Sequence, residues 1–134
     1  TTEIYTLSLH DALPIYWAKN QLRYSSGGQF PFPILFDGEK TGYIGKKSLP
    51  IGLFDFASYQ TESLELPQRF VLALISDGIL ETLPQATLRD KQAFLLSLIS
   101  NVDLDIKTLI QALGLDQAGP LPDDVTLLLI KRTE

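Results

Sequence analysis

Six consecutive apolar residues, Phe70–Ile75, are followed directly by Ser76, Asp77 and Gly78. A short apolar run without a polar residue is typical of a β-strand that is buried on both faces. A second buried strand is predicted over Val125–Ile130, near the end of the sequence. Any fold for this chain must therefore place both segments inside its core.

Shorter strands are predicted before the Phe70–Ile75 run, and helices are predicted after it. The strands span 22–26, 34–36, 41–44 and 61–66, and the helices span 79–83, 88–99 and 106–113. The pair Asp37-Gly38, between two of these strands, is typical of a plain hairpin turn. Because strands and helices do not alternate regularly, their order favours an α+β fold with antiparallel pairing.

Composition excludes several classes of protein. The chain has 134 residues, no cysteine and a net charge of −5. The absence of cysteine excludes a disulfide scaffold and a cysteine-based zinc site, and it fits a reducing compartment such as the cytoplasm. No apolar run reaches the ~18 residues of a membrane helix, and the acidic balance argues against binding to a phosphate backbone. We therefore expect neither a membrane nor a nucleic acid as a partner.

Acidic residues flank the two predicted buried strands. Asp77 follows the first strand, and Asp123 and Asp124 precede the second. If the strands are antiparallel neighbours, these carboxylates converge at one edge of the sheet and repel one another unless a divalent cation neutralises them. Mg²⁺ and Mn²⁺ are held by carboxylates and waters in this way, and Gly78 would let a water or substrate approach the backbone closely. The alternative is structural, since Asp-Gly and Pro-Asp-Asp sequences are also common in turns.

Three aromatic residues, Phe54, Phe56 and Tyr59, lie close together in the sequence. Packing in the core is the more frequent role for such residues, and we expect that role here. An exposed aromatic loop that binds a partner is the alternative.

The first fifteen residues, Thr1–Ile15, have no clear helical or strand period. Their sequence resembles the conceptual translation of a common short-read sequencing adapter. We therefore expect residues 1–15 to be an artefact that contributes nothing to the fold, and residues 16–134 to hold the domain. Because His10 is the single histidine, chemistry that requires a histidine is not expected in residues 16–134.

Four segments resemble motifs of the metal-dependent PPM protein phosphatases, in the sporulation-phosphatase (SpoIIE) branch. Ser76–Glu81 and Asp123–Thr126 are similar to the last two acidic motifs of that family. Tyr24–Pro31 is similar to the glycine-histidine-proline segment of the branch, and Leu49–Leu53 is similar to its next turn. The order and spacing of the four segments match, so the resemblance extends from Tyr16 to the C-terminus.

This resemblance implies the αββα sandwich of the family, with antiparallel sheets flanked by helices and with the N-terminal part missing. It implies that Asp77 and Asp123 are metal ligands, with Gly78 and Asp124 close to the metal, in a centre of two Mg²⁺ or Mn²⁺ ions. The other ligands of the family come from upstream motifs that this sequence lacks, so we expect the fragment to be inactive alone. Gln29 stands where the branch often has histidine.

A narrower resemblance links Leu35–Leu53 and Ser76–Leu88 to the output domain of RssB-type response regulators of pseudomonads, in which a receiver domain comes first. It implies a cytoplasmic phosphatase in sigma-factor and general stress signalling. The expected substrate is the phosphoserine of an anti-sigma-factor antagonist or of a sigma-factor regulator. The alternative is a non-catalytic adaptor of the same fold that binds a sigma factor or its regulator. The presence of Asp77 and Asp123 favours the enzyme, since an adaptor needs neither carboxylate.

Overall fold

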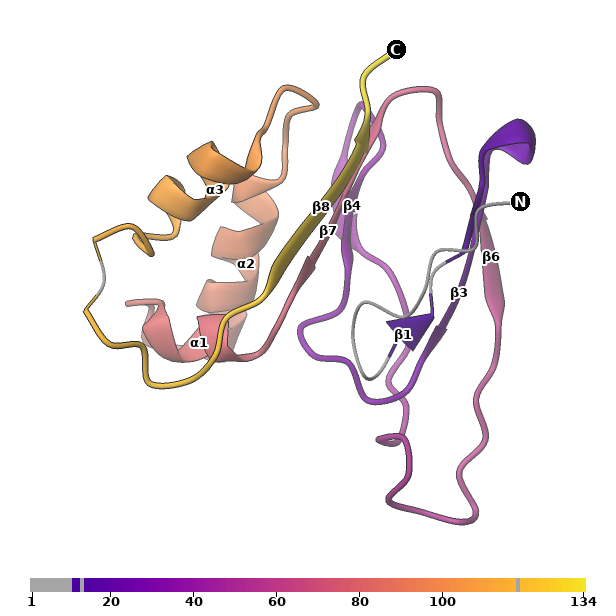
Figure 1. The fold of residues 1–134 in the computed structure, drawn as a ribbon, viewed down its shortest axis with the longest axis horizontal. Helices are drawn as coiled ribbons and strands as arrows, with labels where there is room; N and C mark the ends of the chain where they lie inside the picture. Colours follow the sequence, from indigo (N-terminus) through magenta and orange to yellow (C-terminus); the bar gives the residue numbers. More distant parts are fainter. Residues whose placement is uncertain (1–10, 13, 118) are drawn as a thin grey trace. The chain divides into compact units, whose positions relative to one another are not determined.

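The computed structural model describes residues 11–12, 14–117 and 119–134. These residues divide into two compact units, each with its own antiparallel sheet (Figure 1). The first unit holds the described residues up to Gln29 together with Gly45–Gln68, and the second unit holds Phe30–Ile44 and Arg69–Glu134. The structure therefore has the α+β composition and the antiparallel strand pairing that the sequence predicts.

Strand β3 (Gln21–Ser26) is the central strand of the first sheet. Along one edge it pairs with β1 (Asp11–Ala12) and β2 (Ile15–Tyr16). Along the other edge it pairs with β6 (Glu62–Glu65). The pairing of β1 and β2 follows one continuous register, so these two short strands form a single hairpin with β3.

The last residues of the Thr1–Ile15 segment belong to this hairpin, which differs from the expectation that the segment contributes nothing to the fold. Ile15 is 8% exposed and lies opposite Leu22, which is fully buried. The backbone N–H of Arg23 donates to the carbonyl oxygen of Pro14 at 3.1 Å. Residues 1–10 lie outside the described residues, and the adapter origin of the segment stays a prediction.

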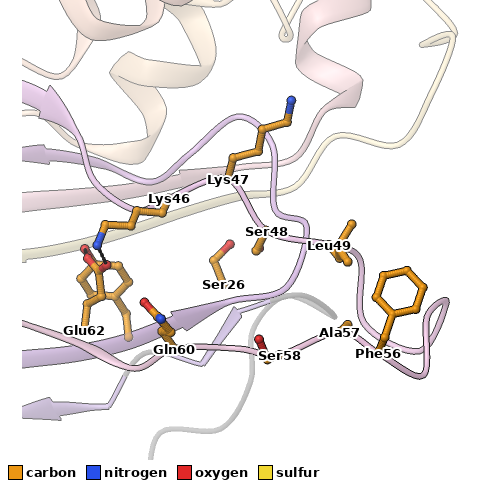
Figure 2. A pocket seen from close by; sticks show the side chains of 11 residues that line it. Ser26, Lys46, Lys47, Ser48, Leu49, Phe56, Ala57, Ser58, Gln60 and Glu62 are labelled. Carbon is orange, nitrogen blue, oxygen red and sulfur yellow. Dashed lines mark hydrogen bonds and ion pairs between the residues drawn. The ribbon is translucent and has the colours of Figure 1, made fainter.

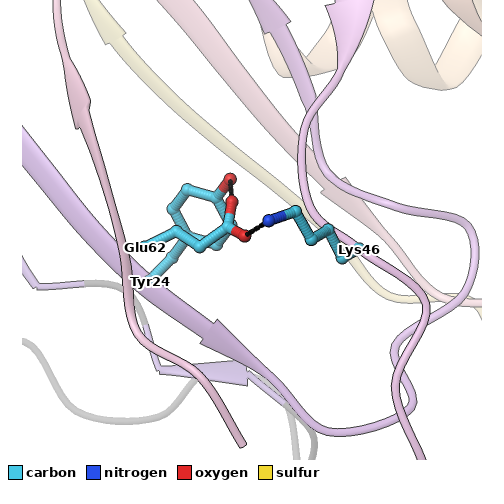
Figure 3. A network of polar contacts seen from close by, with 3 residues as sticks. All are labelled: Tyr24, Lys46 and Glu62. Atoms are coloured by element: carbon cyan, nitrogen blue, oxygen red, sulfur yellow. Dashed lines mark hydrogen bonds and ion pairs between the residues drawn. The ribbon is translucent and has the colours of Figure 1, made fainter.

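A polar network joins β3, β6 and the segment that follows Gly45 (Figure 3). The Tyr24 hydroxyl donates to Oε2 of Glu62 at 2.8 Å, and Nζ of Lys46 lies 2.5 Å from Oε1 of Glu62. Hydrogen bonds from Lys46 and then from Tyr24 hold the pKa of Glu62 below its usual value. Burial, and then the neighbouring carboxylate, raises the pKa of Tyr24 to about 12. At neutral pH the Tyr24 hydroxyl therefore stays protonated and the Glu62 carboxyl stays ionised, which are the states that their hydrogen bond requires.

The second sheet has the strand order β5-β4-β7-β8. Strand β4 (Ile34–Phe36) pairs with β5 (Thr41–Tyr43) on one side and with β7 (Phe70–Ile75) on the other. Strand β7 also pairs with β8 (Leu127–Arg132). Every residue of β7 is buried, as its apolar run predicts.

The predicted hairpin turn at Asp37 and Gly38 is confirmed by the pairing of β4 with β5. The Oδ1 atom of Asp37 accepts hydrogen bonds from the backbone N–H groups of Lys40 and Glu39 at 2.9 and 3.0 Å. These bonds lower the pKa of Asp37. Gly38 has a φ of +98°, a conformation that glycine adopts without steric cost.

Among the described residues, three α-helices lie together on one side of the second sheet (Figure 1). They are α1 (Gly78–Thr82), α2 (Leu88–Leu98) and α3 (Ile106–Ala112). Their apolar residues form one core with β4 and β7, whose buried members are Ile34, Phe36, Val71, Ala73, Ile75, Ile79, Leu83, Leu95, Ile99, Val102, Leu109 and Leu113. Each helix in the described part of the chain is too short or too polar to cross a bilayer.

The second predicted buried strand, Val125–Ile130, differs from the structure in its limits and in its burial. Strand β8 begins at Leu127, two residues later, and continues to Arg132. Its side chains are half-buried or exposed, because β8 ends the strand order and has β7 as its single partner strand among the described residues. Val125 and Thr126 lie in the loop before the strand.

The expectation that Phe54, Phe56 and Tyr59 pack in the core is wrong. Their side chains are 42%, 74% and 38% exposed. The rings of Phe54 and Phe56 contact each other with centroids 5.3 Å apart, and the Tyr59 hydroxyl donates to the carbonyl oxygen of Pro50 at 3.0 Å. These residues belong to an exposed loop, the alternative that the sequence left open.

Ile15→Ala tests whether the end of the first segment belongs to the folded unit. Loss of a buried isoleucine side chain should lower the free energy of unfolding by about 2 kcal/mol or more. The matched control is Tyr16→Ala in the same strand, where the side chain is 41% exposed and the expected change is within about 1 kcal/mol. Urea denaturation measures both. Equal stability of wild type and Ile15→Ala would restore the boundary at Tyr16.

Glu62→Gln tests the network around Glu62. A carboxylate whose pKa is lowered by folding stabilises the protein above its unfolded pKa, here near 4.5, and this contribution disappears as the pH falls through the folded pKa. Wild type should therefore have a higher Tm than Glu62→Gln at pH 7, and the difference should shrink as the pH falls below about 4.5. Thermal unfolding from pH 3 to 7 measures this. A difference that does not change with pH would contradict the charged network.

Candidate functional site

The predicted antiparallel pairing of the two buried segments is confirmed by β7 and β8. Ile75 lies opposite Leu127, and beyond this last pair the N–H of Ser76 donates to the carbonyl oxygen of Thr126 at 3.0 Å. The end of β7 and the approach to β8 therefore lie at the same edge of the sheet. This edge carries Asp77, next after Ser76, and the loop that precedes β8.

Ser76 ties this loop to the end of β7. Its hydroxyl oxygen accepts a hydrogen bond from the N–H of Thr126 at 2.8 Å and donates to the carbonyl oxygen of Asp124 at 3.3 Å. Sequence reasoning did not single out this role of Ser76. The available signal was a hydroxyl residue placed directly between a buried strand and Asp77.

Gly78 allows the loop to come close to the start of α1. A Cβ atom at this position would lie 2.3 Å from the carbonyl oxygen of Asp124 and 3.4 Å from Cβ of Asp123. Real Cβ atoms do not approach a carbonyl oxygen so closely, so the contact requires glycine. The close neighbour of Gly78 in the structure is the backbone of Asp124. That Gly78 lets a water or substrate approach stays a prediction.

The three carboxylates at this edge are exposed to solvent. Asp77 stands at the N-cap of α1, and its side chain makes no capping hydrogen bond. Asp123 accepts a hydrogen bond through Oδ1 from the N–H of Asp124 at 2.8 Å. Within the described part of the chain, none of the three forms an ion pair with a lysine or arginine. No lysine or arginine of the described residues therefore neutralises their negative charge.

Carboxylate oxygens are hard donors of the kind that Mg²⁺ and Mn²⁺ prefer. Two observations are compatible with a cation site here. The loop contacts Gly78 closely, and the side chain of Asp77 makes no capping hydrogen bond to α1. In the described ranges, however, no group of three or more histidine, cysteine, aspartate or glutamate residues is arranged to hold a metal ion. That Asp77 and Asp123 supply part of a larger set of metal ligands stays a prediction.

Comparison with known proteins bears on this arrangement. The family described as "Stage II sporulation protein E (SpoIIE)" matches residues 6–133 of the chain. No curated protein matches it.

Several solved structures are similar to the chain. The phosphatase domain of the cell fate determinant SpoIIE from Bacillus subtilis, presoaked with Mn, has a TM-score of 0.69 at 19% identity, with 95% of this chain and 57% of that chain covered. The RsbU and RsbW domains of Rv1364c from Mycobacterium tuberculosis give 0.70 at 21% identity, covering 91% and 36%. The PP2C phosphatase domain of SpoIIE with a fragment of its regulatory domain gives 0.67 at 19% identity, covering 90% and 36%.

These similarities show the fold, which is that of the PP2C and SpoIIE phosphatases and agrees with the predicted fold class. The chain spans 57% of the first of these structures and 36% of each of the other two.

Gly78→Ala tests the close approach of the loop. The added Cβ must displace the backbone of Asp124, which should lower the free energy of unfolding by about 1–3 kcal/mol. Gly42→Ala in β5 is the control, because an added Cβ there meets no atom within 4 Å. Urea denaturation of both variants measures the difference. If the two substitutions cost the same, the loop does not rest on Gly78.

Proposed function

Since the chain belongs to the stage II sporulation protein E (SpoIIE) family, we propose that it is the C-terminal part of a metal-dependent protein serine/threonine phosphatase domain of the PPM type. One observation carries the proposal: Asp77 and the Asp123-Asp124 loop meet at one edge of the second sheet. The PP2C fold of the similar structures supports it.

Asp77 and Asp123 would hold a Mg²⁺ or Mn²⁺ ion, with Asp124 and Gly78 beside them. In the family that the chain resembles, two such ions supply an activated water that attacks a phosphoserine or phosphothreonine. The protein's own contribution is to keep the carboxylates together. Ser76 would do this through its hydroxyl and Gly78 through its close contact with the loop. The side chain of Asp77 makes no capping hydrogen bond to α1. The remaining ligands would come from the upstream motifs that the resemblance implies.

The cellular setting of the proposal rests on the narrower resemblance of Leu35–Leu53 and Ser76–Leu88. The complete protein would be a cytoplasmic response regulator of the RssB type, with an N-terminal receiver domain and a role in sigma-factor and stress signalling. Its substrate would be a phosphorylated anti-sigma-factor antagonist. The similarity to the RsbU and RsbW domains of Rv1364c supports the phosphatase fold on which this setting depends.

The second candidate is a non-catalytic adaptor of the same fold that binds a sigma factor or its regulator. The exposure of Phe54, Phe56 and Tyr59 favours this candidate, because an aromatic loop that is not used by the core is available to a partner. Catalysis and binding make different demands on Asp77 and Asp123, so substitutions at these positions separate the two candidates.

Asp77→Asn and Asp123→Asn, made in the complete protein, test the catalytic proposal. Asparagine keeps the shape of the side chain but removes its charge, so a hard cation is held far less tightly. Mn²⁺-dependent release of phosphate from a phosphoserine substrate should fall by orders of magnitude in both variants. The Tm should stay the same or rise, because repulsion between carboxylates is relieved.

Asp37→Asn is the matched control, since Asp37 serves the β4–β5 turn and lies outside the proposed site. Its turnover should equal that of wild type. Equal turnover in all three variants would remove the ligand assignment and favour the adaptor.

A further inference from the structure

The first unit contains a pocket of about 470 Å³ whose lining combines polar and apolar side chains. Ser26, at the end of β3, lies on one side together with Ser58 and Gln60 from the segment before β6 (Figure 2). The segment Lys46–Leu49 forms the opposite side. All of these residues belong to one compact unit, so the pocket is a feature of that unit itself.

Backbone and side-chain contacts hold the two sides of the pocket in place. The N–H of Gly28 donates to the hydroxyl oxygen of Ser48 at 3.0 Å, and the N–H of Ile51 donates to the carbonyl oxygen of Gly27 at 3.1 Å. Gly28 has a φ of +94°, and a Cβ there would lie 2.8 Å from Cα of Pro50. The pocket is therefore formed before any ligand arrives, which lowers the entropic cost of binding.

The lining has more hydrogen-bond donors than the protein itself uses. The one carboxylate in the lining, Glu62, already accepts from Tyr24 and Lys46 (Figure 3). Among the residues that the structure describes, the Ser26 hydroxyl is buried without a hydrogen-bond partner. The Ser48 hydroxyl accepts from Gly28, so its own hydrogen remains to be donated.

Positive charge adds to this surplus of donors. Lys47 is exposed at the rim and takes no part in the ion pair of Glu62. A group with several acceptor atoms and a negative charge, such as a carboxylate or a phosphate, complements such a lining.

Part of the rim of the pocket is apolar. Leu49 and Phe56 line it, and both side chains are exposed. Phe54 packs against Phe56 and extends the apolar surface. A free inorganic ion would use none of this surface, whereas a peptide offers an apolar side chain next to an acidic one. Proteins bind the backbone of a nucleic acid through larger clusters of lysine and arginine, so two lysines do not indicate a nucleic-acid site.

We propose that this pocket binds an acidic peptide segment of a partner protein, with a carboxylate or phosphate beside Lys47, whose charge is not used by Glu62, and an apolar side chain against Leu49 and Phe56. The proposal rests on the proposed function only in taking the partner to be a protein. A phosphatase and an adaptor would use the pocket in the same way.

Four synthetic peptide libraries test the proposal on the immobilised full chain. The libraries share randomised flanks and carry a central Glu-Glu, phosphoserine, Gln-Gln or Lys-Lys. The Glu-Glu or phosphoserine library should be retained best and Lys-Lys least, and 1 M salt should reduce the retention of the acidic libraries. The order of the two acidic libraries tells which anionic group fits better. Retention that does not depend on the central charge would overturn the proposal.

Lys47→Glu should lower the retention of the acidic libraries by at least about threefold. Lys19→Glu is the control, because it makes the same charge change at an exposed site of the same unit outside the pocket. Ser26→Ala should also weaken retention and leave Tm unchanged, since the hydroxyl that it removes has no partner. Equal losses in Lys47→Glu and Lys19→Glu would reduce the effect to net charge and contradict the pocket.

The readout is binding, so it is independent of turnover. Retention of acidic peptides, together with unchanged turnover in Asp77→Asn and Asp123→Asn of the complete protein, would support the pocket and contradict the catalytic proposal. Phosphatase activity with no preference for acidic peptides would do the reverse.

Discussion

The antiparallel pairing of β7 with β8 is the constraint on which the second sheet and the candidate site both depend. It runs from Phe70 opposite Arg132 to Ile75 opposite Leu127 without a break in register. The ladder joins segments that are distant in sequence, since Ser76 and Thr126, where it ends, are 50 positions apart. The helices between them must therefore return across the same sheet, and their apolar faces complete the core with β4 and β7.

The same ladder separates apolar from charged residues. Strand β7 is buried along its whole length, so charged residues are accommodated only beyond its end. There the carboxylates of Asp77, Asp123 and Asp124 are solvated. They are brought near one another by backbone contacts at Ser76 and Gly78 rather than by attraction between side chains. Carboxylates that lie close together repel one another unless a divalent cation neutralises them, and the proposed metal site rests on this principle.

Features that depend on local chemistry were predicted from the sequence. The apolar run Phe70–Ile75 predicts a buried strand because no polar residue interrupts it, and the structure agrees. Asp37-Gly38 predicts a hairpin turn because the aspartate accepts local N–H groups and glycine adopts a positive φ. The positions of Asp77 and Asp123 at one sheet edge followed from the order of the strands, once antiparallel pairing was assumed.

Features that depend on distant neighbours were not predicted. The exposure of Phe56 and the half-burial of β8 depend on which other segments cover them. The types of the residues themselves do not predict this burial. The place of Ile15 in a hairpin depends on the free edge of β3, since backbone pairing accepts almost any side chain. The sequence by itself determined the fold class, the buried strand and the turn, because apolar periodicity and turn chemistry act over a few residues. Only the tertiary structure decided the contact of Gly78 with Asp124, the hydrogen bonds of the Ser76 hydroxyl to the loop before β8, and the pocket in the first unit. These features join atoms that long-range strand pairing and loop packing bring together.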